Sequence, residues 1–135
     1  MRDIEFRGKR IHRIKNKQWQ YGSLIVGHNR FDIVTEVKST GEIDFVMVDP
    51  ETVGQYTGLA DKNGVKIFEG DIVDGIRVGG LKGAVIFVNS SFWICTQEYT
   101  IKYIEYELYK YRNLEVIANI HDNPELLEVG DGNKD

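Results

Sequence analysis

Four acidic residues near the middle of the chain form its densest group of side chains suited to acid–base or metal chemistry. They are Asp61, Glu69, Asp71 and Asp74. Neighbouring carboxylates shift each other's pKa values and can share a proton or a cation. Each acid also has a structural alternative, because aspartates in turns and loops accept hydrogen bonds from backbone amides. We therefore expect structural roles for these acids, and an enzyme with a carboxylate site is the alternative.

Positive charge and aromatic side chains gather near the N-terminus. Residues 1–17 hold seven basic residues against two acidic ones, a net charge of +5, so the other 118 residues carry −9. Proteins that bind single-stranded nucleic acids stack bases on aromatic rings and neutralise phosphates with cations. The candidate binding residues are Arg7, Lys9, Arg10, Arg13, Lys15, Lys17, Trp19 and Tyr21. The favoured alternative is an edge strand whose charged solvent face discourages pairing with another sheet.

Other catalytic or metal-binding patterns are not found in the sequence. His12, His28 and His121 are far apart and have no second ligand at a recognisable spacing. Cys95 lies in an apolar stretch, where a buried inert thiol is more common than a nucleophile. The chain contains no Gly-x-Ser-x-Gly elbow and no Walker-type loop. We predict no catalytic residue, no metal and no cofactor.

Short apolar stretches separated by turn residues predict a mainly β protein (β-rich α+β) with two lobes. Residues 1–52 are expected to form an N-terminal β-meander, which Pro50 closes. Residues 53–128 are expected to form a small SH3-like β-barrel lobe packed with the first, because short strands and turns follow one another at the spacing of such a barrel. Within it, Asn63-Gly64 predicts a tight type I′ turn, since both residues accept positive φ at low cost.

Residues 98–113 fit two structures. Ile101, Ile104, Leu108 and Tyr111 make one helical stripe, whereas Ile104 to Leu108 alternates as a strand does. We predict a short helix near 100–112 and keep the strand as the alternative. The stretch also holds more tyrosines than one stripe can bury, so some are expected on the surface. They are Tyr99, Tyr103, Tyr106, Tyr109 and Tyr111.

The end of the chain carries a helix start and an acidic tail. Asp122, Asn123 and Pro124 predict a short C-terminal helical turn, because aspartate and asparagine cap helices and proline suits the first helical position. Residues 129–135 are expected to fray.

Length and composition limit the class of protein. The 135 residues are 41% hydrophobic and 28% charged with a net charge of −4, which fits a globular chain and excludes fibrous and low-complexity classes. No stretch approaches the roughly 18 apolar residues of a membrane span, and residues 1–7 lack the apolar centre of a signal peptide. We therefore expect a cytoplasmic protein without membrane contact. The overall negative charge opposes nucleic acid except at the basic segment.

Several blocks of the sequence together resemble the YopX family of phage and prophage proteins. The blocks are residues 4–10, 21–24, 53–59, 61–64, 67–73 and 115–127. The residues that carry the motif within the later blocks are Gly54, Tyr56, Gly58, Asp61, Asn63, Gly64, Gly70, Asp71, Asn119 and Pro124. Where the family commonly has glycine before Asn119, this chain has Ala118. The resemblance implies a phage or prophage origin in a bacterial host and a two-part β-rich fold, and it implies no activity.

We favour two classes of function over the enzyme alternative. The first is a protein-binding accessory module that contacts an unidentified host or phage protein, or associates with itself through its oppositely charged ends. The second is a nucleic-acid-binding module that uses the basic N-terminal segment. The first is favoured, because the acidic remainder of the chain opposes a polyanion.

Overall fold

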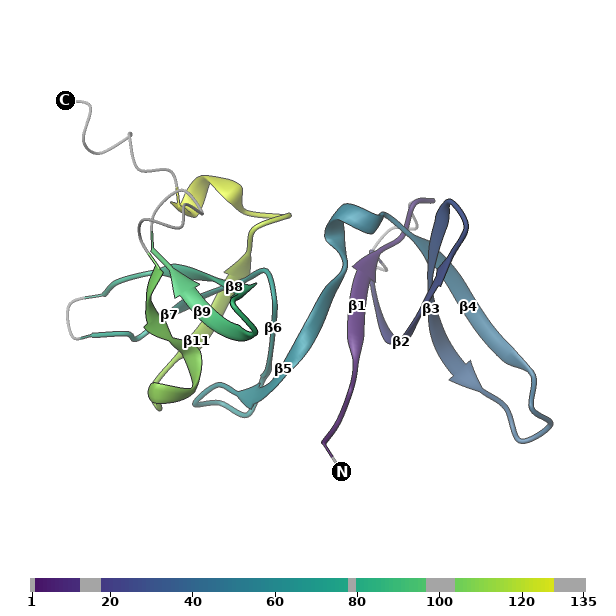
Figure 1. The fold of residues 1–135 in the computed structure, drawn as a ribbon, viewed down its shortest axis with the longest axis horizontal. Coiled ribbons are helices and arrows are strands. Elements are labelled where there is room, and N and C mark those ends of the chain that lie inside the picture. The colour runs from purple at the N-terminus through teal and green to yellow at the C-terminus, as the bar shows by residue number, and fades with distance from the viewer. Residues whose placement is uncertain (1, 13–17, 78–79, 97–103, 128–135) are drawn as a thin grey trace. The chain divides into compact units, whose positions relative to one another are not determined.

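The computed structural model describes residues 2–12, 18–77, 80–96 and 104–127, and these are mostly β-strand (Figure 1). The chain divides into two compact units, Met1–Gly58 and Leu59–Asp135, whereas the sequence placed the division between residues 52 and 53. Among the described residues, no helix has the length and apolar character needed to cross a membrane.

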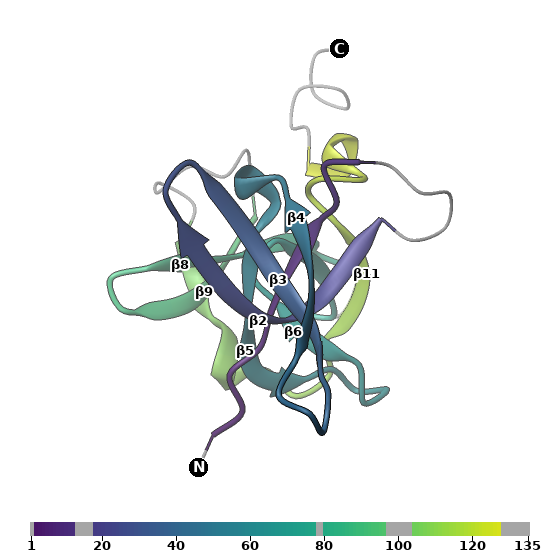
Figure 2. The same cartoon turned by 90° about the vertical axis from the view of Figure 1, so that its right-hand side faces the viewer.

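Five strands build most of the first sheet, and a sixth, β6 (Lys66–Phe68), adds to it beside β5. The five are β1 (Phe6–Lys9), β2 (Trp19–Gly27), β3 (Arg30–Val37), β4 (Ile43–Val48) and β5 (Gly54–Ala60). The order is β4-β3-β2-β1-β5 with antiparallel neighbours, which confirms the predicted meander (Figure 2). The short 3₁₀ helix η1 (Pro50–Thr52) separates β4 from β5 and is capped by Asp49, whose side chain accepts from the amide of Glu51.

The basic first strand is not an edge strand, so that prediction was wrong. β1 pairs with β2 on one side, and Phe6 and Arg7 pair with Gln55 and Gly54 of β5 on the other. The reason lies outside the local pattern: β5 returns from more than 40 residues further along the chain to occupy the edge of β1.

The first unit wraps around a small apolar interior. Beyond β1 the chain returns to β4, where Arg10 bridges to Val48 and the amide of Ile11 donates to the carbonyl of Met47. Ile33 and Val48 are completely buried inside, and Gly8 lies so close to Val48 that an added methyl group would touch its side chain. Side chains alternate between the two faces of a strand, so every second residue of β2, β3 and β4 points away from this interior.

Six strands follow in the C-terminal unit. They are β6 (Lys66–Phe68), β7 (Asp71–Asp74), β8 (Gly83–Val88), β9 (Ser91–Cys95), β10 (Ile104–Glu107) and β11 (Glu115–Asn119). Five of them form an antiparallel sheet of order β10-β9-β8-β7-β11. Its core includes Val73, Val85, Ile94 and Leu108, all at most 1% exposed. The sheet order does not establish that the strands close into an SH3-like barrel, so the barrel stays a prediction.

The turn type of the β5–β6 hairpin differs from the sequence prediction. At the β5–β6 hairpin the amide of Gly64 donates to the carbonyl of Asp61, and Gly64 alone has positive φ (+83°), so the loop is a three-residue turn closed by a glycine bulge. The type I′ prediction for Asn63-Gly64 was therefore wrong. A two-residue turn with positive φ at both positions occurs instead between β8 and β9, at Asn89 and Ser90.

The predicted helix near 100–112 was also wrong over its described part. Residues 104–107 form β10, which pairs with β9, and Leu108–Lys110 form the single 3₁₀ turn η3. The strand alternative is confirmed for residues 104–107, and both Tyr106 of β10 and Leu108 at the start of η3 pack into the core. Tyr109 is 57% exposed, in line with the surface tyrosines expected here. Tyr99 and Tyr103 lie outside the described residues.

The predicted C-terminal helical turn is confirmed as the 3₁₀ helix η4 (Pro124–Leu127), and its Leu127 packs on Ile72 and Ala84. The tail 129–135 lies outside the described residues.

Candidate functional site

Asp61 uses both carboxylate oxygens to hold backbone amides. Its Oδ1 accepts from the amides of Asn63 (2.8 Å) and Val65 (2.9 Å), and its Oδ2 accepts from the amide of Val116 (2.9 Å). Burial raises the pKa of Asp61, but the amides of Val116, Val65 and Asn63 and the charge of Lys62 outweigh burial and hold the pKa below its ordinary value. The residue thus ties the β5–β6 hairpin to β11 and has a structural role.

Two of the other three central acids, Asp71 and Asp74, accept from backbone amides. Asp71 is 2% exposed, and its Oδ2 accepts from the amide of Phe68 at 2.7 Å. Asp74 Oδ1 accepts from the amide of Gly75 at 2.7 Å. Glu69 is half-buried. Within the described ranges, no group of three or more histidine, cysteine, aspartate or glutamate side chains could hold a metal ion. The enzyme with a carboxylate site therefore gains no observation in its favour.

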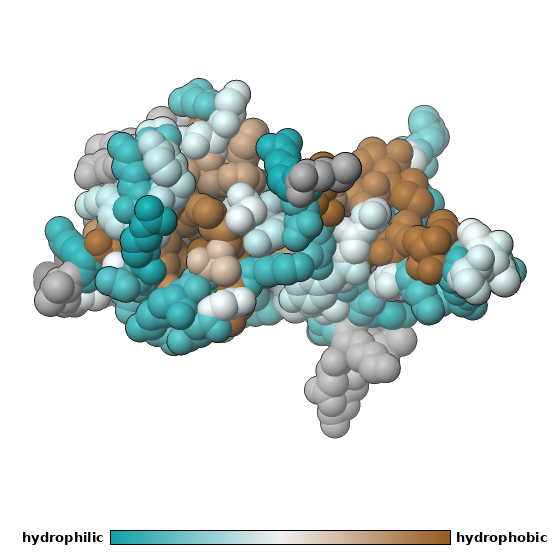
Figure 3. Space-filling view, turned by 90° about the horizontal axis from the view of Figure 1, so that it is seen from below, coloured by the Kyte–Doolittle hydropathy of each residue, from teal (hydrophilic) through white to brown (hydrophobic). Residues whose placement is uncertain are grey.

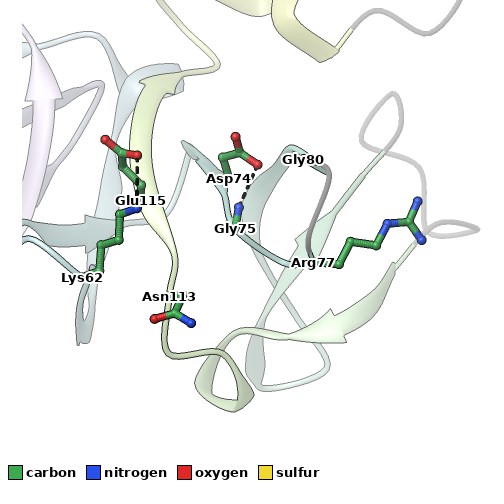
Figure 4. Close-up of a pocket in the computed structure, with 7 residues that line it drawn as sticks. All are labelled: Lys62, Asp74, Gly75, Arg77, Gly80, Asn113 and Glu115. Carbon is green, nitrogen blue, oxygen red and sulfur yellow. Dashed lines mark hydrogen bonds and ion pairs between the residues drawn. The ribbon is translucent and has the colours of Figure 1, made fainter.

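A shallow polar hollow of about 180 Å³ lies beside Asp74 in the C-terminal unit (Figure 4). It is lined by Lys62, Asp74, Gly75, Arg77, Gly80, Asn113 and Glu115. Lys62 Nζ lies 3.7 Å from Glu115 Oε1, and Figure 4 shows the side chain of Arg77 extending away from both. No sequence pattern indicated this hollow, because it joins residues about 50 positions apart whose local patterns are those of ordinary turns. Its charges oppose each other, and no nucleophile and base converge in it.

The structure brings together four of the residues predicted to bind nucleic acid. In the β1–β2 register Arg7 lies opposite Tyr21, and Lys9 lies opposite Trp19. The Arg7 guanidinium carbon is 4.6 Å and the Lys9 ammonium 5.8 Å from the centre of the Trp19 ring. Arg7 is only 6% exposed. These cations stack on the ring that a base would need, and such contacts stabilise the folded chain itself.

Of the remaining basic candidates, the structure describes Arg10. Arg10 Nε donates to the carbonyl of His12 at 3.2 Å, and Arg13, Lys15 and Lys17 lie outside the described residues.

An apolar surface on the outside of the N-terminal sheet was not predicted as a site. Its register places Ile25 and Met47 on either side of Asp32, Val34 beside Phe45, and Val37 beside Ile43. We call these six apolar residues of β2, β3 and β4 the outer apolar face. Phe45 is 52% exposed and Val37 is 68% exposed, although both are apolar. Figure 3 shows apolar residues gathered on the surface of this unit.

The charged residue within the outer apolar face is neutralised. Arg30 holds Asp32 through two hydrogen bonds of 2.8 and 2.6 Å. The hydrogen bond from Arg30 lowers the pKa of Asp32, burial opposes it, and the positive charge of Arg30 lowers it further. The acid thus stays ionised and paired, and the face presents no net charge at this position.

The sequence of β4 contains a pattern that bears on the outer apolar face. Phe45, Val46, Met47 and Val48 are four apolar residues in a row. Such a run is typical of a strand buried on both faces. In this structure Val48 is fully buried, Val46 and Met47 are half-buried, and Phe45 is 52% exposed.

Comparison with known proteins identifies the family. The sequence profile described as "YopX protein" matches residues 5–128, nearly the whole chain. The chain belongs to the YopX family. A search of curated proteins found no match. The solved structure titled "Crystal structure of protein EF1440 from Enterococcus faecalis" is 26% identical, with a TM-score of 0.59, and the alignment covers 95% of this chain and 100% of that one.

Motif residues of the YopX resemblance have structural roles in this fold. Gly58, Gly64 and Gly70 all have positive φ, which only glycine adopts without strain. Asn119 Oδ1 accepts from the amides of His121 and Asp122 and so shapes the turn before η4. These roles account for the residue types without a catalytic function.

Proposed function

We propose that this YopX-family chain is a protein-binding accessory module and that the outer apolar face is its docking surface. The observation that carries the proposal is the exposure of Ile25, Val37, Ile43 and Phe45 on one side of one sheet. Contiguous apolar surface rimmed by polar residues is typical of protein-interaction sites. The proposal assigns binding and no catalysis, because the central carboxylates serve backbone amides.

Phe45 is the expected anchor of this surface. It lies at the middle of the face, with Val34 directly opposite on β3 and Met47 two residues along its own strand. Central aromatic residues surrounded by aliphatic ones commonly dominate the binding energy of an interface. Moving one such exposed side chain fully out of water contributes roughly 1.5–3 kcal/mol.

The proposed setting is the cytoplasm of a bacterial host that carries a phage or prophage, with a host or phage protein as the partner. The support is the membership of the YopX family and the resemblance of the sequence blocks to that family of phage and prophage proteins.

A capture experiment tests the docking surface. Tagged wild-type protein and the variants Phe45→Asp and Phe87→Asp are used to capture partners from prophage-induced cells, with nuclease treatment and mass spectrometry. Phe87 of β8 is a matched control, because it is 53% exposed and Phe45 is 52% exposed. We expect Phe45→Asp to lose the nuclease-resistant partner and Phe87→Asp to keep it. Equal retention by both variants would reject the outer apolar face as the docking surface.

A second copy of the chain is a further candidate partner. The N-terminal unit has a net charge of +1 and the C-terminal unit −5, so unlike units of two copies attract. Light scattering at tens of micromolar, at low and high salt, tests the idea. A strict monomer at both salt concentrations rules out self-association.

Nucleic acid is the alternative partner. The observation in its favour is the cluster of Arg7, Lys9, Trp19 and Tyr21 on neighbouring strands. The stacking of both cations on Trp19 counts against it, since a base would have to displace them.

A further inference from the structure

The tip of the β5–β6 hairpin holds an asparagine followed by a glycine, a pair with its own chemistry. Asn63 and Gly64 are both exposed, and the space around the Gly64 Cα is open. Glycine has no side chain to hinder approach to its backbone nitrogen. That nitrogen can therefore attack the side-chain amide carbon of the preceding asparagine.

The reaction needs only water as co-reactant. A bond forms between the Gly64 nitrogen and the Asn63 side-chain carbon, the nitrogen gives its proton to solvent, and ammonia leaves. Water then opens the resulting cyclic imide at either carbonyl and yields aspartate or isoaspartate at position 63. The sum is conversion of one amide to one carboxylate, with no oxidation or reduction.

In the folded chain, the attacking nitrogen is held by Asp61. The amide of Gly64 donates to the carbonyl of Asp61 at 3.0 Å. The amides on either side, those of Asn63 and Val65, donate to Asp61 Oδ1 at 2.8 and 2.9 Å. The amide of Asp61 in turn donates to the carbonyl of Val65 at 2.8 Å. The nitrogen cannot turn towards the Asn63 side chain until this set of bonds opens.

We infer that Asn63-Gly64 is a site of spontaneous deamidation and that Asp61 controls its rate by holding the hairpin closed. The rate in the folded protein is then the rate of the open chain multiplied by the fraction of time the hairpin is open. This inference is independent of the proposed binding function.

Peptide mapping by mass spectrometry measures the conversion. The full chain is incubated in mildly alkaline buffer, once folded and once unfolded in guanidinium chloride, and the peptide that contains residue 63 is followed over time. We expect conversion to be at least about tenfold faster in the unfolded chain, because opening must break several hydrogen bonds of about 1 kcal/mol each. Asn89, which precedes Ser90, is an internal comparison and should convert more slowly when unfolded. Equal rates in folded and unfolded chains would overturn the control by the fold.

Two variants separate the role of Asp61 from a general charge effect. Asp61→Ala removes the side-chain acceptor of the Asn63 and Val65 amides, while the backbone carbonyl that accepts from Gly64 remains. The hairpin should then open more often, and conversion of the folded chain should be about tenfold faster. Asp49→Ala is the matched control, because its carboxylate also accepts a backbone amide, that of Glu51, but in the other unit. It should leave the rate at residue 63 unchanged, and an equal acceleration by both variants would contradict the inference.

Hydrogen exchange tests the same point without any substitution, in case Asp61→Ala does not fold. The amides of Gly64 and Val65 in the wild-type chain should be protected well beyond the rate of an unfolded peptide. Exchange of Gly64 at the unfolded rate would show that its nitrogen is not held, and would overturn the inference.

Discussion

Asp61 is the side chain on which the β5–β6 hairpin and β11 both depend. It is 8% exposed and accepts from three amides, one of them 55 residues away in sequence. Its replacement removes the acceptor of three partly buried amides, and a hydrogen bond to a charged group contributes about 1.5–3 kcal/mol. A single acid therefore controls the stability of much of the C-terminal unit.

The pH dependence of stability reports on this acid. The pKa of Asp61 in the folded chain is below its ordinary value of 3.8, so its contribution is fully present above that value and is lost as pH falls through the lower folded pKa. We expect Asp61→Asn to lower the free energy of unfolding by about 2 kcal/mol near neutral pH. The gap to wild type should narrow in acid. Denaturant unfolding at several pH values measures it, and a gap that widens below pH 3.8 would contradict the role given to Asp61.

Ser90 adopts a conformation that suits glycine. Its φ is +65° in the β8–β9 turn, and a left-handed conformation costs a residue with a side chain about 1–2 kcal/mol. We expect Ser90→Gly to raise the free energy of unfolding by about 1 kcal/mol. Ser91→Gly, one residue later inside β9, should lower it by roughly 0.5–1 kcal/mol. Thermal unfolding of the two variants should move in opposite directions, and a parallel shift would mean that this turn is misassigned.

At the scale of elements, the β5–β6 hairpin requires glycine at position 64, although the predicted turn type was wrong. Gly64 has φ of +83°, and nothing lies within 4 Å of a Cβ added there. A β-branched side chain would therefore be strained by the backbone and not by crowding. Gly64→Val should lower the free energy of unfolding by about 1 kcal/mol or more. Melting experiments check this, and an unchanged melting temperature would contradict the strain.

The outer apolar face is likewise a property of elements. Its residues come from β2, β3 and β4 and become neighbours only in the antiparallel register of these strands. The same register hides Ile33 on the other face and leaves Phe45 half exposed. A shift of one residue would exchange the two faces, because side chains alternate along a strand.

At the scale of the whole molecule, charge decides which partner is compatible with the chain. The net charge is −4, and the C-terminal unit alone carries −5. A protein that neutralises Z phosphates of duplex DNA loses affinity with a log–log salt slope of about −0.9Z, so salt titration detects even a few contacts. The acidic unit opposes such contacts.

We expect no binding to oligonucleotides tighter than about 10⁻⁴ to 10⁻⁶ M at physiological salt, the range of nonspecific attraction. Fluorescence anisotropy with labelled single-stranded and duplex oligonucleotides at two salt concentrations measures it, and the double variant Arg10→Ala, Arg13→Ala is the control for the basic segment. Submicromolar affinity that falls with salt and weakens in the double variant would favour the nucleic-acid alternative over the protein-binding proposal.

The sequence by itself determined the β-rich class, the N-terminal meander, the C-terminal helical turn and the family. These follow from local information: strand alternation, turn residues and Pro124 act over a few positions, and the motif blocks are contiguous. Local patterns also indicated that Asp61 and Asp71 serve loop amides.

Only the tertiary structure decided the strand neighbours and the exposure of individual side chains, because both depend on which distant segments pair. β1 became an inner strand only when β5 returned to pair with it. Residues 104–107 became a strand because β9 offered an open edge, although the helical stripe was present in the sequence. Trp19 could not be recognised as covered by Arg7 until the register of β1 and β2 was fixed. The exposure of Phe45 also depends on tertiary structure, because the sequence does not show whether a neighbouring element covers an apolar residue.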